Sequence, residues 1–167
     1  MVVTVSPSGY AHYRNLTGAI TTTINGKTVG TAAPVSYNPT LNSTATARRS
    51  LQKRDNDCGP STFVDYTTGG SPYVADCQCI EDYAYANPEG WPFSFIFGAW
   101  FDLLWCETCM FGVQAHDFLP TYVGNEDVGD LVRDSINLFQ QNGLVGAQGD
   151  MGCERFFGTS NVEWAIY

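Results

Sequence analysis

Residues 71–86, SPYVADCQCIEDYAYA, decide the fold because they combine a helix start with two cysteines. Ser71 is a helix-capping residue type, and Pro72 suits the first helical position, where no backbone N–H is needed. The apolar stripe of this helix is Tyr73, Cys77, Ile80 and Ala84. Residues two apart on a helix lie about 200° apart around its axis. With Cys77 facing the core, Cys79 lies on the flank, so the two thiols need partners in different places.

A second helix is predicted downstream. Asn125 is its expected cap, and Asn142 and Gly143 end it through a left-handed turn. Its buried stripe is Val128, Leu131, Val132, Ser135 and Phe139. Acidic residues in its first turn interact favourably with the positive end of the helix dipole, which supports a helix start here.

Short strands complete the expected fold. We expect them at residues 61–66, at 109–113 and, as a neighbour of the latter, at 118–123. The chain closes with apolar and polar residues in alternation, and the apolar set is Val162, Trp164 and Ile166. The prediction is an α+β fold in which two helices pack on a mostly antiparallel sheet.

Charge divides the chain into two parts. Residues 1–54 carry six Lys and Arg and no acidic residue, whereas residues 55–167 hold all 17 carboxylates against Arg133 and Arg155. The net charge of −9 argues against nucleic acid and anionic membranes as partners. The first part is rich in Ser, Thr, Asn and Gly without sustained periodicity, so we expect it to be largely disordered.

The basic segment has the features of a propeptide. It ends at Lys53 and Arg54, a pair that kexin-type proteases of the secretory pathway cut, and such a cut gives a domain of residues 55–167. Asn15 and Asn42 lie in glycosylation motifs within the segment. The first residues lack the apolar run of a secretory signal, so we expect the sequence to begin after that signal.

Six cysteines in the acidic part indicate an oxidised, extracellular framework. They are Cys58, Cys77, Cys79, Cys106, Cys109 and Cys153, and the sequence leaves all 15 connectivities open. Cys106 and Cys109 form a CxxC pair, but no second such pair and no set of four metal ligands accompanies them. We therefore expect structural disulfides, and neither a metal nor a cofactor.

Aromatic residues crowd the stretch from 91 to 105. One interpretation is a pair of core strands that turn at Gly98. The other is a protruding interaction patch made by Phe97, Trp100 and Phe101, which meets a receptor, glycan or lipid interface. The sequence leaves both open.

Catalytic residues are hard to nominate. We call the basic segment of residues 1–54 the leader, and His116 beside Asp117 is the one imidazole after it. No serine lies in a nucleophile elbow, and the glycines after Gly143 lack the lysine of a phosphate loop. The expectation is a protein that is not an enzyme, and a small acid-active hydrolase stays as an alternative.

Several ordered motifs resemble the necrosis-inducing factor domain of fungal pathogen effectors. They are DCGPSTF (57–63), SP with DC and Ile80 (71–80), CMFGV (109–113), VGNEDV with DL (123–131), GLVGAQG to Cys153 (143–153) and VEWAIY (162–167). The resemblance implies a secreted, cysteine-bridged effector that causes necrosis or immune responses in plants. Through a stated likeness to killer toxins, it also implies a compact sandwich and an alternative action on competing cells.

The family's cysteine pattern matches Cys58, Cys77, Cys109 and Cys153, which leaves Cys79 and Cys106 as additions. We hypothesise that these two pair with each other. The expected protein is a secreted, extracellular monomer that binds an unknown host protein or cell-surface component. Its dense carboxylates predict greater stability near pH 5 than near pH 8.

Overall fold

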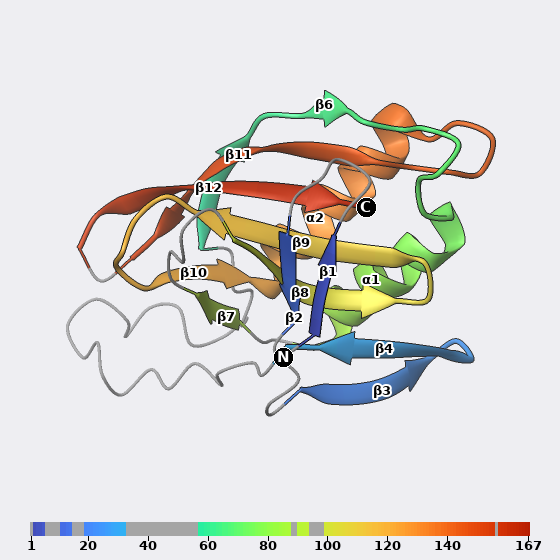
Figure 1. Ribbon diagram of the computed structural model, residues 1–167, viewed down its shortest axis with the longest axis horizontal. Helices are drawn as coiled ribbons and strands as arrows, with labels where there is room; N and C mark the ends of the chain where they lie inside the picture. Colours follow the sequence, from blue (N-terminus) through green and yellow to red (C-terminus); the bar gives the residue numbers. More distant parts are fainter. Residues whose placement is uncertain are drawn as a thin grey trace.

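The computed structural model describes residues 2–5, 11–14, 19–32, 57–87, 90–93, 99–155 and 157–167 (Figure 1). Its helices are α1 (Val74–Ala86) and α2 (Asn125–Phe139). Its strands are β1 (Val2–Val5), β2 (Ala11–Arg14), β3 (Ile20–Ile24), β4 (Lys27–Thr31), β5 (Cys58–Ser61), β6 (Val64–Asp65), β7 (Gly90–Phe93), β8 (Trp100–Cys106), β9 (Cys109–Ala115), β10 (Thr121–Gly124), β11 (Ala147–Glu154) and β12 (Thr159–Ile166). Within these ranges neither helix is long and apolar enough for a membrane crossing.

One large sheet carries the fold. Ten of the described strands belong to it, in the order β1-β2-β8-β9-β12-β11-β5, with β4 also paired to β8, β3 to β4 and β6 to β11. All of these pairings are antiparallel except that of β2 with β8. Both helices lie behind this sheet in Figure 1. The expected α+β class with two helices is confirmed.

The core lies between the helices and the centre of the sheet. The apolar residues of β12, which are Val162, Trp164 and Ile166, are buried as their alternation predicts. Phe111 of β9 stacks on Trp164 with ring centroids 6.4 Å apart, and Phe63 meets Trp164 edge-on at 5.2 Å. Aromatic pairs in these geometries add to the energy of burial alone. Trp164 is therefore the centre of the packing.

Both helices start differently from the prediction. Val145 donates a backbone hydrogen bond to Pro72 and Tyr73 bridges to Leu144, so this segment stays extended and α1 begins at Val74. In α2 the N-cap is Gly124 instead of Asn125, because the Asn125 amide donates to the carbonyl of Ala84 at the end of α1.

The end of α2 differs too. The helix stops at Phe139, and the left-handed residues Asn142 and Gly143, with φ of 53° and 78°, form the next turn. That turn joins Gln141 to Leu144. The two residues therefore shape the path into β11 and do not cap the helix.

Strand pairing was the weaker part of the prediction. The segment expected at 118–123 forms β10, which pairs with β7 and not with the strand at 109–113. The strand expected at 61–66 is two short strands, β5 and β6, along β11. Residues 91–105 do not form two strands paired with each other either, because β7 pairs with β10 and β8 with β9.

The expectation of a largely disordered leader is wrong for the part of it that the structure describes. Residues 20–31 form the β3–β4 hairpin around Asn25 and Gly26, whose φ angles of 49° and 81° suit a primed turn. Strand β4 then pairs with β8, and Val29 is fully buried. Edge pairing with the sheet supplies the contacts that the leader cannot make by itself.

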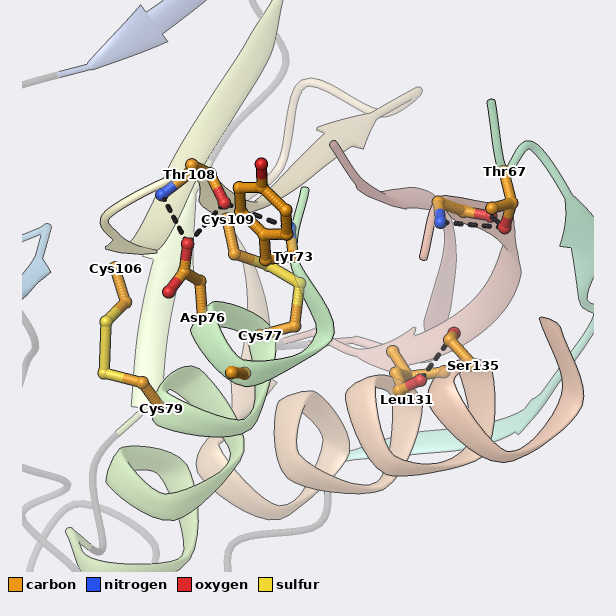
Figure 2. Close-up of a disulfide and its surroundings, with 12 residues drawn as sticks. Thr67, Tyr73, Asp76, Cys77, Cys79, Cys106, Thr108, Cys109, Leu131 and Ser135 are labelled. Carbon is orange, nitrogen blue, oxygen red and sulfur yellow. Dashed lines mark hydrogen bonds between the residues drawn. A yellow bond between two sulfur atoms is a disulfide. The ribbon is translucent and has the colours of Figure 1, made fainter. Parts of the chain in front are cut away.

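Three disulfides tie the elements together. They join Cys58 to Cys153, Cys77 to Cys109 and Cys79 to Cys106. The last is the pair that we hypothesised from the sequence. Figure 2 shows how the second and third connect two sides of one turn of α1 to the two ends of the β8–β9 turn. The CxxC segment is thus a two-residue hairpin turn with both cysteines engaged.

Removing the disulfides one at a time should give unequal losses. The Cys79–Cys106 bond lies within the loop that Cys77–Cys109 already closes, so in the unfolded chain it adds only a small further restriction. Its loss should lower the free energy of unfolding by about 2 kcal/mol. The Cys58–Cys153 bond spans 95 residues, and its loss should cost about 4 to 5 kcal/mol. Urea unfolding of the two double alanine variants measures both. Equal losses in the two variants, or a larger loss for Cys79–Cys106, would contradict the argument from nested loops.

Candidate functional site

The histidine and aspartate that suggested acid–base chemistry do not pair with each other. The His116 ring nitrogen Nε2 lies 3.1 Å from Glu163, while Asp117 accepts from Arg155 at 2.9 Å. Among the described residues, no group of three His, Cys, Asp or Glu side chains could hold a metal ion. The structure therefore adds no catalytic nominee to the sequence analysis.

The aromatic patch expected from the sequence is not at the surface where the structure describes it. Trp100 is 6% exposed, and Phe101 is half-buried against Phe93 with ring centroids 6.4 Å apart. Phe97 lies outside the described residues. The alternative interpretation, that the stretch builds the core, holds for Trp100 because both faces of β8 are covered.

Exposed apolar side chains gather instead at one end of the sheet, on two loops and on β10, which follows the first of them. Loop 116–120 connects β9 to β10, and loop 155–158 connects β11 to β12. Phe118 is 75% and Phe157 73% exposed. We call the following set the loop patch: Phe118, Leu119, Tyr122 and Phe157. Large exposed apolar groups held together make this end of the sheet the candidate interaction site.

An ion pair fixes the two loops to each other. Arg155 donates to Asp117 at 2.9 Å and, through Nε, to the carbonyl of Phe157 at 2.8 Å. Ser160 also donates to Asp117 at 2.9 Å, and Thr121 forms a bridge with Arg155. The loop patch is therefore preorganised, which reduces the entropy lost when it meets a partner.

Sequence reasoning missed the loop patch because burial is not visible in loop residues. Phe118 and Leu119 precede Pro120, and Phe157 precedes Gly158. Large apolar residues beside Pro and Gly at a turn were the available signal, since turn residues seldom reach a core.

A cleft of about 360 Å³ lies between β5 and α2. Its wall combines apolar and acidic side chains, including Phe63, Leu131, Met151, Asp127, Asp130 and Asp134. Asp130 and Asp134 both accept hydrogen bonds from Arg133, at 2.7 and 2.9 Å. The rim of the cleft is therefore partly neutralised.

Asp127 at the cleft joins the start of the acidic domain to α2. Its carboxylate accepts from the backbone N–H groups of Asp57, Cys58 and Gly124, at 2.9, 3.3 and 3.0 Å. Burial raises the pKa of Asp127 to about 7, although these three donors favour the charged form. Asp127 therefore has a pKa near neutral pH.

A second polar cluster joins the two helices. The Tyr85 hydroxyl donates to Asp130 at 2.6 Å and accepts from Arg133 at 2.9 Å. Burial, and then the negative charge of Asp82, raises the pKa of Glu81 on the same side of the helices. Carboxylates outnumber the single arginine of this cluster, so this face of the helices is acidic.

The remaining residues singled out from the sequence lie outside the described residues. They are the processing pair Lys53 and Arg54 and the glycosylation acceptors Asn15 and Asn42. Processing and glycosylation therefore stay predictions.

The raised pKa of Asp127 predicts a fall in stability with rising pH. Between 3.8, its ordinary pKa, and about 7, the folded protein holds a proton that the unfolded chain has released. The free energy of unfolding then decreases across this window by at most about 1.4 kcal/mol per pH unit. Thermal melts should show a higher Tm at pH 5 than at pH 8.

The matched variant is Asp127→Asn, which keeps an acceptor oxygen and cannot ionise. Its Tm should vary less between the two pH values than that of the natural chain. A Tm that rises steadily toward pH 8, or an undiminished slope in the variant, would contradict the role of Asp127.

Comparison with known proteins identifies the family. Residues 57–153 match the Hce2 family, described as "pathogen effector; putative necrosis-inducing factor". "Probable chitinase LysM18" of Penicillium expansum is 31% identical over 113 residues, which are 66% of this chain and 8% of the relative. "Secreted chitinase LysM12" of the same fungus is 29% identical over 118 residues, which are 64% of this chain and 7% of the relative. The chain spans less than a tenth of these relatives, and the family match covers more than half of the chain, which therefore belongs to the Hce2 family of pathogen effectors.

Proposed function

We propose that this chain is a secreted effector whose folded domain binds an extracellular host component through the loop patch and thereby causes necrosis or immune responses. The observation that carries the proposal is the pair of strongly exposed rings, Phe118 and Phe157, on loops that an ion pair holds together. Family membership supports the effector role. Three disulfides and a relative named as secreted support an extracellular location.

Binding fits the geometry better than catalysis does. The loop patch has a rigid base and apolar tips, which are the features of a recognition surface with a central aromatic contact. Its polar residues are engaged with one another, since Arg155 and Ser160 both bond Asp117. These engaged polar groups support an effector that acts by binding.

A second candidate function is an antimicrobial toxin that acts on competing cells. The names of the two relatives favour it, because both are called chitinases and this domain corresponds to a small share of each. Because a similar domain forms part of proteins named chitinases, this candidate function would act at a cell wall that contains chitin. A secreted hydrolase is the third alternative, and release of sugars from cell-wall material by the purified chain would establish it.

Changing Phe118 and Phe157 to Ser tests the proposed function. Both side chains are largely exposed, so the variant should keep the Tm of the natural chain within a few degrees. Infiltrated into leaves, it should need at least about ten times more protein to cause necrosis, since exposed aromatic contacts contribute about 1 to 2 kcal/mol each to binding.

The control changes two exposed side chains far from the loop patch in sequence, Tyr66→Ser and Leu138→Ser. It should act like the natural chain. Equal necrosis from both variants would contradict the role of the loop patch in binding. Growth arrest of yeast without leaf necrosis would favour the toxin.

A further inference from the structure

The edge of β8 that faces away from β9 is covered by the leader. Residues Val29, Gly30 and Thr31 of β4 pair antiparallel with Cys106, Trp105 and Leu104. Farther along the same strand, β2 pairs with Trp100 and Phe101. The family match begins at residue 57, so both covering strands lie outside it. Among the described strands of the family domain, none pairs with this edge of β8, so removal of the leader leaves β8 as an edge strand there.

An open edge strand presents unpaired backbone groups and binds another extended strand readily. In this chain β4 shows which strand the edge accepts. Gly30 lies against the indole of Trp105, and a Cβ atom at this position would come within 2.1 Å of that ring. The position opposite Trp105 therefore requires glycine. On either side of it, Val29 is fully buried and Thr31 is 1% exposed.

Side-chain contacts define two further positions. The indole N–H of Trp91 donates to the Thr31 hydroxyl at 2.9 Å, so this position needs a hydroxyl acceptor. Lys27 donates to the Asp76 carboxylate at 2.6 Å and to the Ala75 carbonyl at 2.7 Å. Burial disfavours the charge of Asp76, but the hydrogen bonds from Lys27 and Thr108 outweigh it and lower the pKa of Asp76. The position of Lys27 therefore favours a cationic side chain.

We propose that the β8 edge is a strand-binding site, which β4 occupies in the intact chain and which cleavage after Arg54 opens to an extended strand of an extracellular partner. The partner strand carries a cation, a small apolar residue, glycine and a hydroxyl residue at the positions of Lys27, Val29, Gly30 and Thr31. This inference rests on the proposed secreted function, because cleavage belongs to the secretory pathway and the partner lies outside the cell.

A cut at the processing pair separates the β3–β4 hairpin from the family domain. Lys53 and Arg54 lie between the end of the hairpin at Thr31 and the start of the family match at Asp57. While the chain is intact, the connecting segment holds the hairpin at an effective concentration on the order of 1 mM. After the cut the hairpin is a separate peptide, and dilution releases it. Cleavage thus converts a permanent cover into a replaceable one.

Peptide exchange tests the site directly. The intact chain and the chain cut by a kexin-type protease, with its fragments left together, are diluted to nanomolar concentration. A fluorescent peptide of residues 19–32 is then added, and its anisotropy reports binding. The cut chain should bind the peptide with at least about 100-fold higher apparent affinity than the intact chain, since the tethered competitor is lost.

Two peptide variants separate specific pairing from adhesion. Gly30→Val should lose binding because the new side chain meets Trp105. Thr28→Val places the same side chain at an exposed position, where it replaces a hydroxyl by a methyl group, and should bind normally. No uptake by the cut chain, equal uptake of the Gly30→Val peptide, or pairing of two cut chains in place of peptide binding would overturn the proposal.

A second form of the chain carries the site of an unrelated protease in place of residues 50–54. It separates failure of the strand-binding site from failure of processing at Lys53 and Arg54. Exchange in this form together with resistance of Lys53 and Arg54 to the kexin-type protease would overturn opening by processing. The loop patch is unaltered in every form, so the necrosis assay of the Phe118 and Phe157 variant judges the proposed function separately.

Discussion

The attachment of α1 to the β8–β9 hairpin is the constraint on which the rest of the structure depends. Two disulfides from different sides of one helical turn reach the two ends of the two-residue β8–β9 turn. Asp76 accepts hydrogen bonds from the backbone and hydroxyl of Thr108 in that β8–β9 turn. Figure 2 shows these contacts side by side. Because a helix fixed at two points cannot rotate on the sheet, the core face of α1 and the course of β8 are set together.

This junction also receives the leader. Asp76 accepts from Lys27 as well as from Thr108, so one carboxylate connects the helix, the hairpin turn and the β3–β4 hairpin. The charge division that is visible in the sequence thus has a local counterpart, in which a basic leader residue meets a buried acidic residue of the domain. The loop patch lies on different loops, those after β9 and β11, and its ion pair between Asp117 and Arg155 involves neither the leader nor the disulfides.

Local patterns allowed the helices, the closing strand and the α+β class to be predicted, since periodicity reports burial directly. The Trp164 alternation and the α2 stripe are examples, in which Val128 and Val132 are fully buried. Pairing partners could not be predicted, because the residues of β10 do not encode whether β7 or β9 lies beside them. The leader was misjudged although Asn25 and Gly26 form a hairpin signal, because its polar composition gave no sign of the sheet edge that stabilises it. Exposure of Phe118 and Phe157 likewise depends on where loops end in three dimensions.

Hydrogen exchange on the intact and the cut chain measures the central claim, that the leader completes the sheet at β8. In the intact chain the amides of β8 should be protected like those of β9 and β12. After cleavage and dilution, protection should fall for the β8 amides that bond to the leader strands. The β8 amides that bond to β9, and the amides of β9 and β12, should keep theirs, since the disulfides still hold the hairpin to α1. Unchanged protection of β8 after the leader has left, or loss of protection throughout the sheet, would contradict the account.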